Sequence, residues 1–291
     1  MQPGVWSFLT LLAIAIAFVL AARMWKSPAR ATAWLGVMSL VTLAFVFLGM
    51  AMLGMPLGVL VDDNNMYDLP RLQLTTWSIL ILSAYLTAAM SNVMSSVSGP
   101  AAGDGSANAL LIAIPSSVWV LLGIHVTSWV GSPLVLSNKK MQQPEPAKVA
   151  STIQALNATS TPSPATVAQF QARDARRSVA AVAAGHPPVV PTAPEVFTNS
   201  GKIVTKVNRH DASLDDFFRG EEVGNASLVD LGKVQLFFFT VIVGFVYAVS
   251  LYASFRADGP VRAFPQLDSS IVALLGISNA GFIANMAIPH S

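Results

Sequence analysis

The sequence predicts an all-α integral membrane protein with about six transmembrane helices, four of which form two copies of one helical hairpin. Of the 291 residues, 53% are apolar and only 11% are charged, whereas soluble domains carry about 25% charge. The apolar residues gather in long uncharged stretches, and about 20 apolar residues suffice to cross a bilayer. Short motifs also recur in the same order in two parts of the chain.

The apolar stretches give the predicted spans. The first precedes its positive charges, whereas a signal peptide, the alternative, carries them before its apolar region. The second is longer than a bilayer requires, and Gly54, Pro56 and Gly58 predict that its helix ends there rather than forming a glycine-based dimer face. The six predicted spans are residues 4–22, 32–61, 72–90, 109–132, 234–252 and 269–288.

Composition divides the chain into four regions. Residues 1–61 hold the first two spans, and residues 62–137 hold the first hairpin. Residues 138–210 are predicted to form a flexible polar segment rich in Ala, Pro, Ser and Thr, and the part from 142 to 196 has too few large apolar residues to predict a packed core. Residues 211–291 begin with a short juxtamembrane helix, indicated by a capping box of Ser213 and Asp216, and end with the second hairpin.

Two pairs of motifs indicate the duplication. The pattern Asp-Leu-x-basic-apolar-Gln-Leu begins the third span at residues 68–74 and the fifth at 230–236. The fourth and sixth spans share Ser-Ser followed by Leu-Leu-Gly-Ile, at residues 116–124 and 269–277. Chance similarity between apolar helices explains the second pair alone, but not both pairs in the same order. The sequence therefore predicts two parallel hairpins that superpose.

Each residue of the helix-start motif has a physical role. The acid is a good N-cap, the base three residues later can pair with it or reach lipid headgroups, and the amide requires a partner on a neighbouring helix. This predicts a membrane-interface anchor, with ligand or ion binding as the alternative. The motif residues are Asp68, Arg71 and Gln73 in the first copy and Asp230, Lys233 and Gln235 in the second.

Polar and small residues also recur in the fourth and sixth spans. Their spacing of three and four places them on one face of each helix, with Asn279 beside that face. We expect these faces to point into the protein and to meet, either for close packing or as the lining of a water-filled path. His125 is the ionisable side chain deepest in a span, which makes it a functional candidate. The stripe comprises His125, Ser128, Ser132, Ser278, Gly281 and Asn285.

Basic residues in short loops predict the orientation. The loops after the first, third and fifth spans are the more basic, so the N-terminus, the polar segment 138–233 and the C-terminus are expected on the outer side. The basic residues of those loops are Arg23, Lys26, Arg30, Arg256 and Arg262, against Arg71 alone in the short loop of the other side.

At these motifs the chain resembles a family of uncharacterised bacterial multi-pass membrane proteins. The resemblance rests on the paired helix-start motifs, on residues 217–225 (Phe-Phe-Arg-Gly-Glu-Glu-Val-Gly-Asn) and on Leu275-Gly276-Ile277-Ser278. It covers roughly residues 62–137 and 211–291. It implies a bacterial cytoplasmic membrane and brings no known activity with it.

Several function classes are not expected from these residues. The chain has no cysteine, its net charge of +2 is too small to indicate nucleic acid, and its four histidines are scattered. We find no catalytic triad, metal cluster or phosphate loop, so neither an enzyme nor a cofactor is predicted. The spans lack the carboxylates typical of ion-coupled transport. Glu221 and Glu222 are expected in a solvated loop.

Two hypotheses remain. The first is a membrane-anchored structural, sensory or partner-binding component, whose exposed segment carries the function. The alternative is an oligomeric channel or pore lined by the polar faces of the fourth and sixth spans. The expected partners are the lipid bilayer and either a second copy of the chain or another membrane protein.

Overall fold

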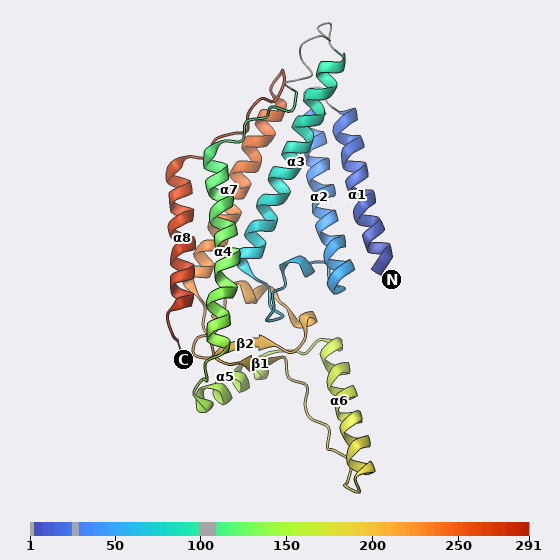
Figure 1. Cartoon of the computed structure of the whole chain (residues 1–291), viewed down its shortest axis with the longest axis vertical. Coiled ribbons are helices and arrows are strands. Elements are labelled where there is room, and N and C mark those ends of the chain that lie inside the picture. The colour runs from blue at the N-terminus through green and yellow to red at the C-terminus, as the bar shows by residue number, and fades with distance from the viewer. Residues whose placement is uncertain (1–2, 25–28, 99–108, 291) are drawn as a thin grey trace. The chain divides into compact units, whose positions relative to one another are not determined.

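The computed structural model describes residues 3–24, 29–98 and 109–290 (Figure 1). The chain divides into two compact units, and each is considered by itself. The bundle unit consists of Met1–Leu60, Leu69–Val130 and Gln235–Phe282. The mixed unit consists of Val61–Asp68, Gly131–Val234 and Ile283–Ser291.

Among the described residues, six helices are long and apolar enough to cross a membrane, the number of long apolar helices that the sequence predicts. The fourth helix is displaced from the prediction, beginning seven residues later and ending later too. The last turns of α4 and α8 and the first turn of α7 belong to the mixed unit. The six helices are α1 (Pro3–Arg23), α2 (Ala29–Leu53), α3 (Leu69–Ser98), α4 (Ser116–Lys140), α7 (Leu231–Arg256) and α8 (Ser269–Ala287).

The end of α2 lies where the glycines predicted it. Gly54 has a φ of 73°, a left-handed conformation that favours glycine, and a short 3₁₀ turn, η1 (Gly58–Leu60), follows. A Cβ on Gly58 would lie 2.9 Å from the carbonyl oxygen of Gly49. The glycines therefore allow the chain to fold back on the last turns of α2.

The two hairpin connections pair with each other in the bundle unit. The backbone N–H of Ala113 donates to the Arg262 carbonyl at 2.8 Å, and that of Phe264 donates to the Ala113 carbonyl at 2.9 Å. This pairing explains why the expected helix start at residue 109 is wrong, because residues around Ala113 are extended and α4 begins only after Pro115. This pairing is compatible with two hairpins of one kind, and the duplication stays a prediction.

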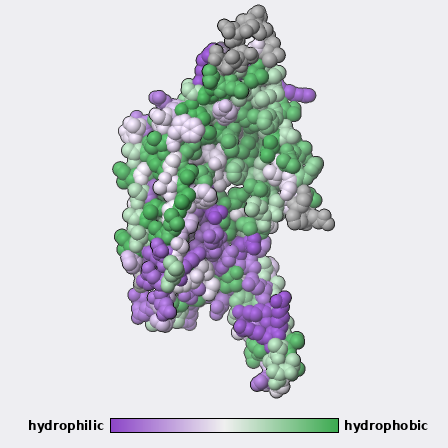
Figure 2. All heavy atoms as spheres, viewed as in Figure 1, coloured by the Kyte–Doolittle hydropathy of each residue, from purple (hydrophilic) through white to green (hydrophobic). Residues whose placement is uncertain are grey.

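The bundle unit is apolar both in its core and on the exposed faces of its helices, and a few polar side chains are buried inside it. Its core contains Trp34, Trp77 and Tyr247. The exposed faces of the helices carry large apolar side chains such as Phe8 and Phe245, which are 63% and 70% exposed. Figure 2 shows apolar side chains over much of the surface of the long helices.

Arg30 is buried at the start of α2 and caps α7. Its guanidinium donates to the carbonyls of Phe255 at 3.1 Å and Gly259 at 2.8 Å, and also to that of Ala257. A cation at a helix C-terminus interacts favourably with the exposed carbonyls and the helix dipole. Arg30 is therefore a buried helix residue, although the prediction of orientation counted it among the basic residues of a loop. Lys26, another residue of that count, lies outside the described residues.

The mixed unit has a small core of its own. Two helices, α5 (Pro146–Thr159) and α6 (Pro164–Ala183), precede an antiparallel hairpin of β1 (Phe197–Ser200) and β2 (Ile203–Lys206). Leu156 of α5 packs with Val196, Phe197, Val204 and Val223. The prediction that residues 142–196 lack a packed core is therefore wrong, because the hairpin supplies the apolar partners that this segment does not contain.

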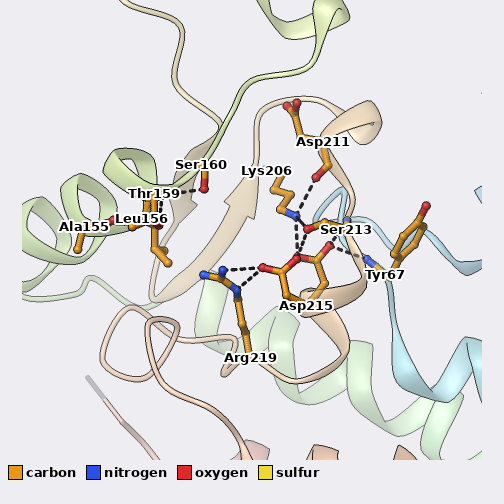
Figure 3. Close-up of polar contacts among 11 residues, drawn as sticks. Tyr67, Ala155, Leu156, Thr159, Ser160, Lys206, Asp211, Ser213, Asp215 and Arg219 are labelled. Carbon is orange, nitrogen blue, oxygen red and sulfur yellow. Dashed lines mark hydrogen bonds and ion pairs between the residues drawn. The ribbon is translucent and has the colours of Figure 1, made fainter.

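Lys206 organises the turns that follow the hairpin, which include η3 (Arg209–Asp211) and η4 (Leu214–Phe217) (Figure 3). Its Nζ pairs with Asp216 Oδ1 at 2.6 Å and donates to Ser213 Oγ at 2.7 Å. The Ser213 backbone N–H donates to Asp216 Oδ2 at 2.9 Å, so the predicted capping box is present. It begins a 3₁₀ turn rather than the expected juxtamembrane helix.

Candidate functional site

The residues predicted from sequence fall into two clusters. One lies in the bundle unit around His125, and the other lies in the mixed unit around Asp230 and Lys233. Only some members of the predicted stripe and motifs take part, and several residues that the sequence did not single out join them.

The bundle cluster centres on Trp77 of α3. Its ring stacks on His125 of α4, with centroids 6.0 Å apart and planes 22° apart. The ring of Tyr247 of α7 lies 5.5 Å from that of Trp77. All three side chains are at most 1% exposed. The sequence marked Trp77 only as an aromatic residue of the helix that follows the first helix-start motif, and it did not mark Tyr247, because aromatic residues in apolar helices resemble lipid-facing residues.

Hydrogen bonds between helices flank the aromatic residues. Gln73 Nε2 of α3 donates to Thr240 Oγ1 of α7 at 2.9 Å, which confirms the expectation that this amide finds a partner on a neighbouring helix. Ser128 Oγ of α4 donates to Asn279 Oδ1 of α8 at 2.8 Å. The fourth and sixth spans thus meet through polar side chains inside one chain.

Several buried polar atoms of this cluster have no hydrogen-bond partner among the described residues. Most buried polar groups in proteins do have a partner, and an unsatisfied group in hydrocarbon costs several kcal/mol. The cluster therefore brings together, from three helices, buried polar atoms that lack a hydrogen-bond partner in the described residues. The atoms are Gln73 Oε1, Trp77 Nε1, His125 Nδ1 and Nε2, and the Tyr247 hydroxyl oxygen.

The predicted inward face of α8 is wrong by one residue. Asn279 is 3% exposed, whereas Ser278 is half-buried and Gly281 is exposed. A Cβ on Gly281 would meet no atom within 4 Å, so Gly281 does not lie against Ser128 as expected. One residue turns a helix by about 100°. The alignment of the two motifs gave Ser278 the position equivalent to His125, and an alignment carries no information on packing.

The second cluster, which we call the clamp, joins the ends of three long helices inside the mixed unit. Lys139, in the last turn of α4, forms a buried ion pair with Glu222, and its Nζ donates to the Ile288 carbonyl at 2.7 Å. Glu222 also accepts the His290 backbone N–H at 3.1 Å. The clamp therefore ties the end of α4 to the residues that follow α8.

The first turn of α7 belongs to the clamp as well. Asp230 Oδ1 accepts the backbone N–H of Lys233 at 3.1 Å, as predicted for an N-cap. The Lys233 side chain does not pair with Asp230 but with Glu221, at 2.7 Å. Asn285 Nδ2 of α8 donates to Asp230 Oδ2 at 3.2 Å. Asn285 therefore contacts a motif residue instead of the predicted stripe.

A tight turn presents the two glutamates. The Glu222 backbone N–H donates to Asn225 Oδ1 at 2.9 Å, and a Cβ on Gly220 would lie 2.3 Å from that oxygen. The expectation of a solvated loop is wrong, since Glu222 is 3% exposed. The reason is electrostatic, because each carboxylate neutralises a lysine that is also buried. A small pocket borders these residues and includes His290.

The remaining predicted residues are less enclosed. Asp68 directly precedes α3 and Arg71 lies in its first turn, and both are half-buried. Gln235 is exposed and donates to Ser278 Oγ at 3.2 Å, so the amides of the two motifs differ in burial. Ser132 is buried in the mixed unit, 3.6 Å from Met286 Sδ.

Comparison with protein families, with curated proteins and with solved structures gave no match. Within residues 3–24, 29–98 and 109–290, no group of three His, Asp or Glu side chains is placed to hold a metal ion. Functional inference therefore starts from the two clusters.

Proposed function

We propose that the chain is a multi-pass membrane protein that holds a folded extramembrane unit at the ends of three spans, and that this unit acts as a structural or partner-binding component. The observation that carries the proposal is the clamp. It joins parts of α4, α7 and α8 to the 221–230 turn through buried ion pairs and hydrogen bonds. Such contacts tie the helix ends and the turn together within the mixed unit.

The distribution of polarity supports membrane insertion. In the bundle unit the exposed helix faces are apolar, while Gln73, Asn92 and Asn279 are buried. Hydrocarbon solvent favours this arrangement, because lipid tails cannot hydrogen-bond an outward amide. Water favours the opposite arrangement.

The proposed location is a bacterial cytoplasmic membrane, with residues 138–233 on its outer side. The location follows from the resemblance at residues 62–137 and 211–291. The orientation follows from the basic loops, of which Arg23, Lys26, Arg256 and Arg262 remain after Arg30 is found buried.

Hydrogen exchange on the full chain in lipid nanodiscs tests the proposal. We expect the amides of residues 221–230 to exchange as slowly as those at the ends of α4 and α8, because parts that are tied together open as a unit. Lys139→Met should raise exchange in the turn and in residues 283–290 together. Fast exchange of the turn in the unchanged chain would contradict the proposal.

A polar path through the bundle is the second candidate, and the unpartnered atoms of the bundle cluster favour it. Water molecules could satisfy Gln73, His125 and Tyr247 if they reached them. Conductance of the purified chain in planar bilayers separates the two candidates. A conductance that His125→Ala alters would support the path, whereas the membrane-anchored component should give none above a protein-free bilayer.

A further inference from the structure

A cavity of about 390 Å³ lies beside the clamp, and all of its lining residues belong to the mixed unit. The smaller pocket that borders Glu222 shares four of these residues, so the two adjoin. We call the larger cavity the Asp230 pocket. It combines polar and apolar side chains, among them Asp230, Asn285, His290, Leu228, Val229 and Leu231.

The clamp beside this pocket holds one negative charge in excess. Lys139 and Lys233 each pair with one glutamate. Asp230 is the third carboxylate, and it accepts hydrogen bonds from two backbone N–H groups and from Asn285 Nδ2. These donors are neutral, so the two lysines of the clamp balance only two of its three carboxylates. The Asp230 pocket therefore favours a cation.

One carboxylate oxygen of the clamp is buried and has no hydrogen-bond partner among the described residues. This atom is Glu221 Oε2, whereas Glu221 Oε1 pairs with Lys233 at 2.7 Å. Glu221 lines the smaller pocket, which shares Asp230 and Asn285 with the larger one. The Asn285 side chain donates to Asp230 through Nδ2, which leaves its carbonyl oxygen to accept. A ligand that fits these groups supplies hydrogen-bond donors together with its positive charge.

A primary ammonium fits these groups better than a metal ion or a quaternary ammonium. Over the described ranges of the chain, no group of three His, Asp or Glu side chains is placed to hold a metal ion. A quaternary ammonium has no N–H to donate and is bound on aromatic faces, but no Phe, Tyr or Trp is among the described residues that line the Asp230 pocket. A primary ammonium carries three N–H donors.

The apolar residues of the pocket indicate that a lipid carries the ammonium. Leu228, Val229 and Leu231 are 61%, 66% and 77% exposed. Leu231 begins α7, whose 26 residues span about 39 Å at 1.5 Å per residue. A bilayer with its headgroups is about 40–45 Å thick. If the proposed membrane insertion holds, the pocket at the start of α7 therefore lies at the level of the headgroups.

We propose that the Asp230 pocket binds the primary ammonium of a lipid headgroup, as in phosphatidylethanolamine. Asp230 and Glu221 recognise the ammonium, which completes the charge balance of the clamp. The phosphate of the same headgroup is favoured beside the first turn of α7, because a helix N-terminus carries partial positive charge. The proposal rests on the proposed membrane insertion and adds a lipid partner to the clamp.

Native mass spectrometry of the full chain in detergent tests this, with dioleoyl phosphatidylethanolamine and dioleoyl phosphatidylcholine as probes. The second lipid carries methyl groups in place of every N–H donor. We expect the chain to retain roughly tenfold more of the ethanolamine lipid at equal concentration, since hydrogen bonds to charged groups are the stronger ones. Glycerophosphoethanolamine has the headgroup without the acyl chains, and it should bind at least roughly tenfold more weakly than the lipid because it buries no acyl chain.

Asp230→Asn tests the carboxylate and keeps a residue type that caps helices well. It should reduce the preference for the ethanolamine lipid to about twofold or less. Asp268→Asn is the matched control. Asp268 also accepts a first-turn N–H, that of Ser270 at 2.8 Å, but it lies at the start of α8 in the bundle unit. The control should keep the full preference.

Val229→Lys is a second variant, at an exposed position of the pocket. Its own ammonium should compete with the lipid headgroup and lower the preference, whereas Val182→Lys on α6, also exposed, should leave it unchanged. Equal retention of the two lipids, an unchanged preference in Asp230→Asn or Val229→Lys, or equal affinity for glycerophosphoethanolamine would each overturn the proposal.

Carbonate extraction of membrane vesicles reports insertion separately. A chain that carbonate removes from the vesicles would count against the proposed function. An inserted chain that shows no preference between the two lipids would count against the Asp230 pocket alone.

Discussion

In the bundle unit, Trp77, His125 and Tyr247 are buried with hydrogen-bonding atoms that have no partner among the described residues. In the mixed unit, Lys139 and Lys233 are also buried, but each is paired with a glutamate. The difference follows from the free energy of burying each kind of group. A buried neutral polar atom without a partner destabilises the fold by a few kcal/mol, whereas an unpaired buried charge destabilises it far more. Removing an unpartnered polar group should therefore stabilise the bundle unit or leave its stability unchanged. Removing a paired carboxylate should destabilise the mixed unit.

The largest effect is expected from Glu222→Gln. It leaves Lys139 buried without its counter-charge, which typically costs about 3–5 kcal/mol. Glu145→Gln is the control, because the Glu145–Lys148 pair is 61% and 52% exposed and such pairs contribute about 1 kcal/mol or less. The free energy of opening, measured by hydrogen exchange at residues 203–206, reports both. If both variants lose the same free energy of opening, the ion pairs of the clamp contribute no more to stability than exposed ion pairs do.

A dependence on pH should come from Asp62 in the mixed unit. Burial raises the pKa of Asp62 to about 6, hydrogen bonds from Met66 and Asn64 oppose the rise, and the nearby Glu221 adds to it. The folded form therefore holds a proton that the unfolded chain has already lost, so stability should fall as pH rises from about 4 to about 6 and then level off. We expect a loss of roughly 2 kcal/mol across that window. Asp62→Asn should remove this dependence of stability on pH. If stability still falls with pH at the same slope in this variant, another group causes the fall.

His125→Phe should be neutral or stabilise the bundle unit, by about 1 kcal/mol. Phenylalanine keeps the ring against Trp77 and removes two nitrogens that have no partner in the described residues. The midpoint of thermal unfolding in detergent measures this change, with His210→Phe at an exposed position as the control. A marked destabilisation would show that His125 has a polar partner, and would favour the path through the bundle.

The smallest effect is expected from Ser128→Ala. It removes the hydrogen bond to Asn279, and such bonds between membrane helices contribute about 0.6 kcal/mol on average. Thr127→Ala is the control, because the Thr127 hydroxyl bonds to its own helix at Gly123. If Ser128→Ala costs several times more, hydrogen bonds in the bundle are as important as the ion pairs of the clamp.

The number of long apolar helices in the described residues could be predicted from sequence because length and hydropathy alone determine it. The inward face of α8 could not, since Ile277 and Leu274 outside are as apolar as Leu275 inside. In water the polar face of a helix marks its exposed side, but α8 has apolar side chains both inside and outside, so the spacing of apolar residues does not mark its inward face. This explains the one-residue error at Ser278 and Asn279.

The clamp could be predicted only in part. The cap at Asp230 is local and follows from the motif, as does the capping box at Ser213. The partner of Lys139 lies 83 residues away at Glu222, and no spacing rule connects them. The sequence does show that Lys139 lies at the end of an apolar stretch that contains no acidic residue. This indicates that an acidic partner exists elsewhere in the chain, but it does not indicate which residue it is.

The cap that Arg30 places on α7 has a consequence for how the chain is made. Its acceptor at Phe255 lies 225 residues later. Ribosomes add about 5–20 residues each second, so Arg30 is synthesised on the order of ten to forty-five seconds before the carbonyls it binds. If the proposed membrane insertion holds, the guanidinium stays hydrated or near headgroups until these acceptors are made, since an unpaired charge in hydrocarbon is costly. The cap that fixes the start of α2 against the end of α7 therefore forms only after α7 has been synthesised.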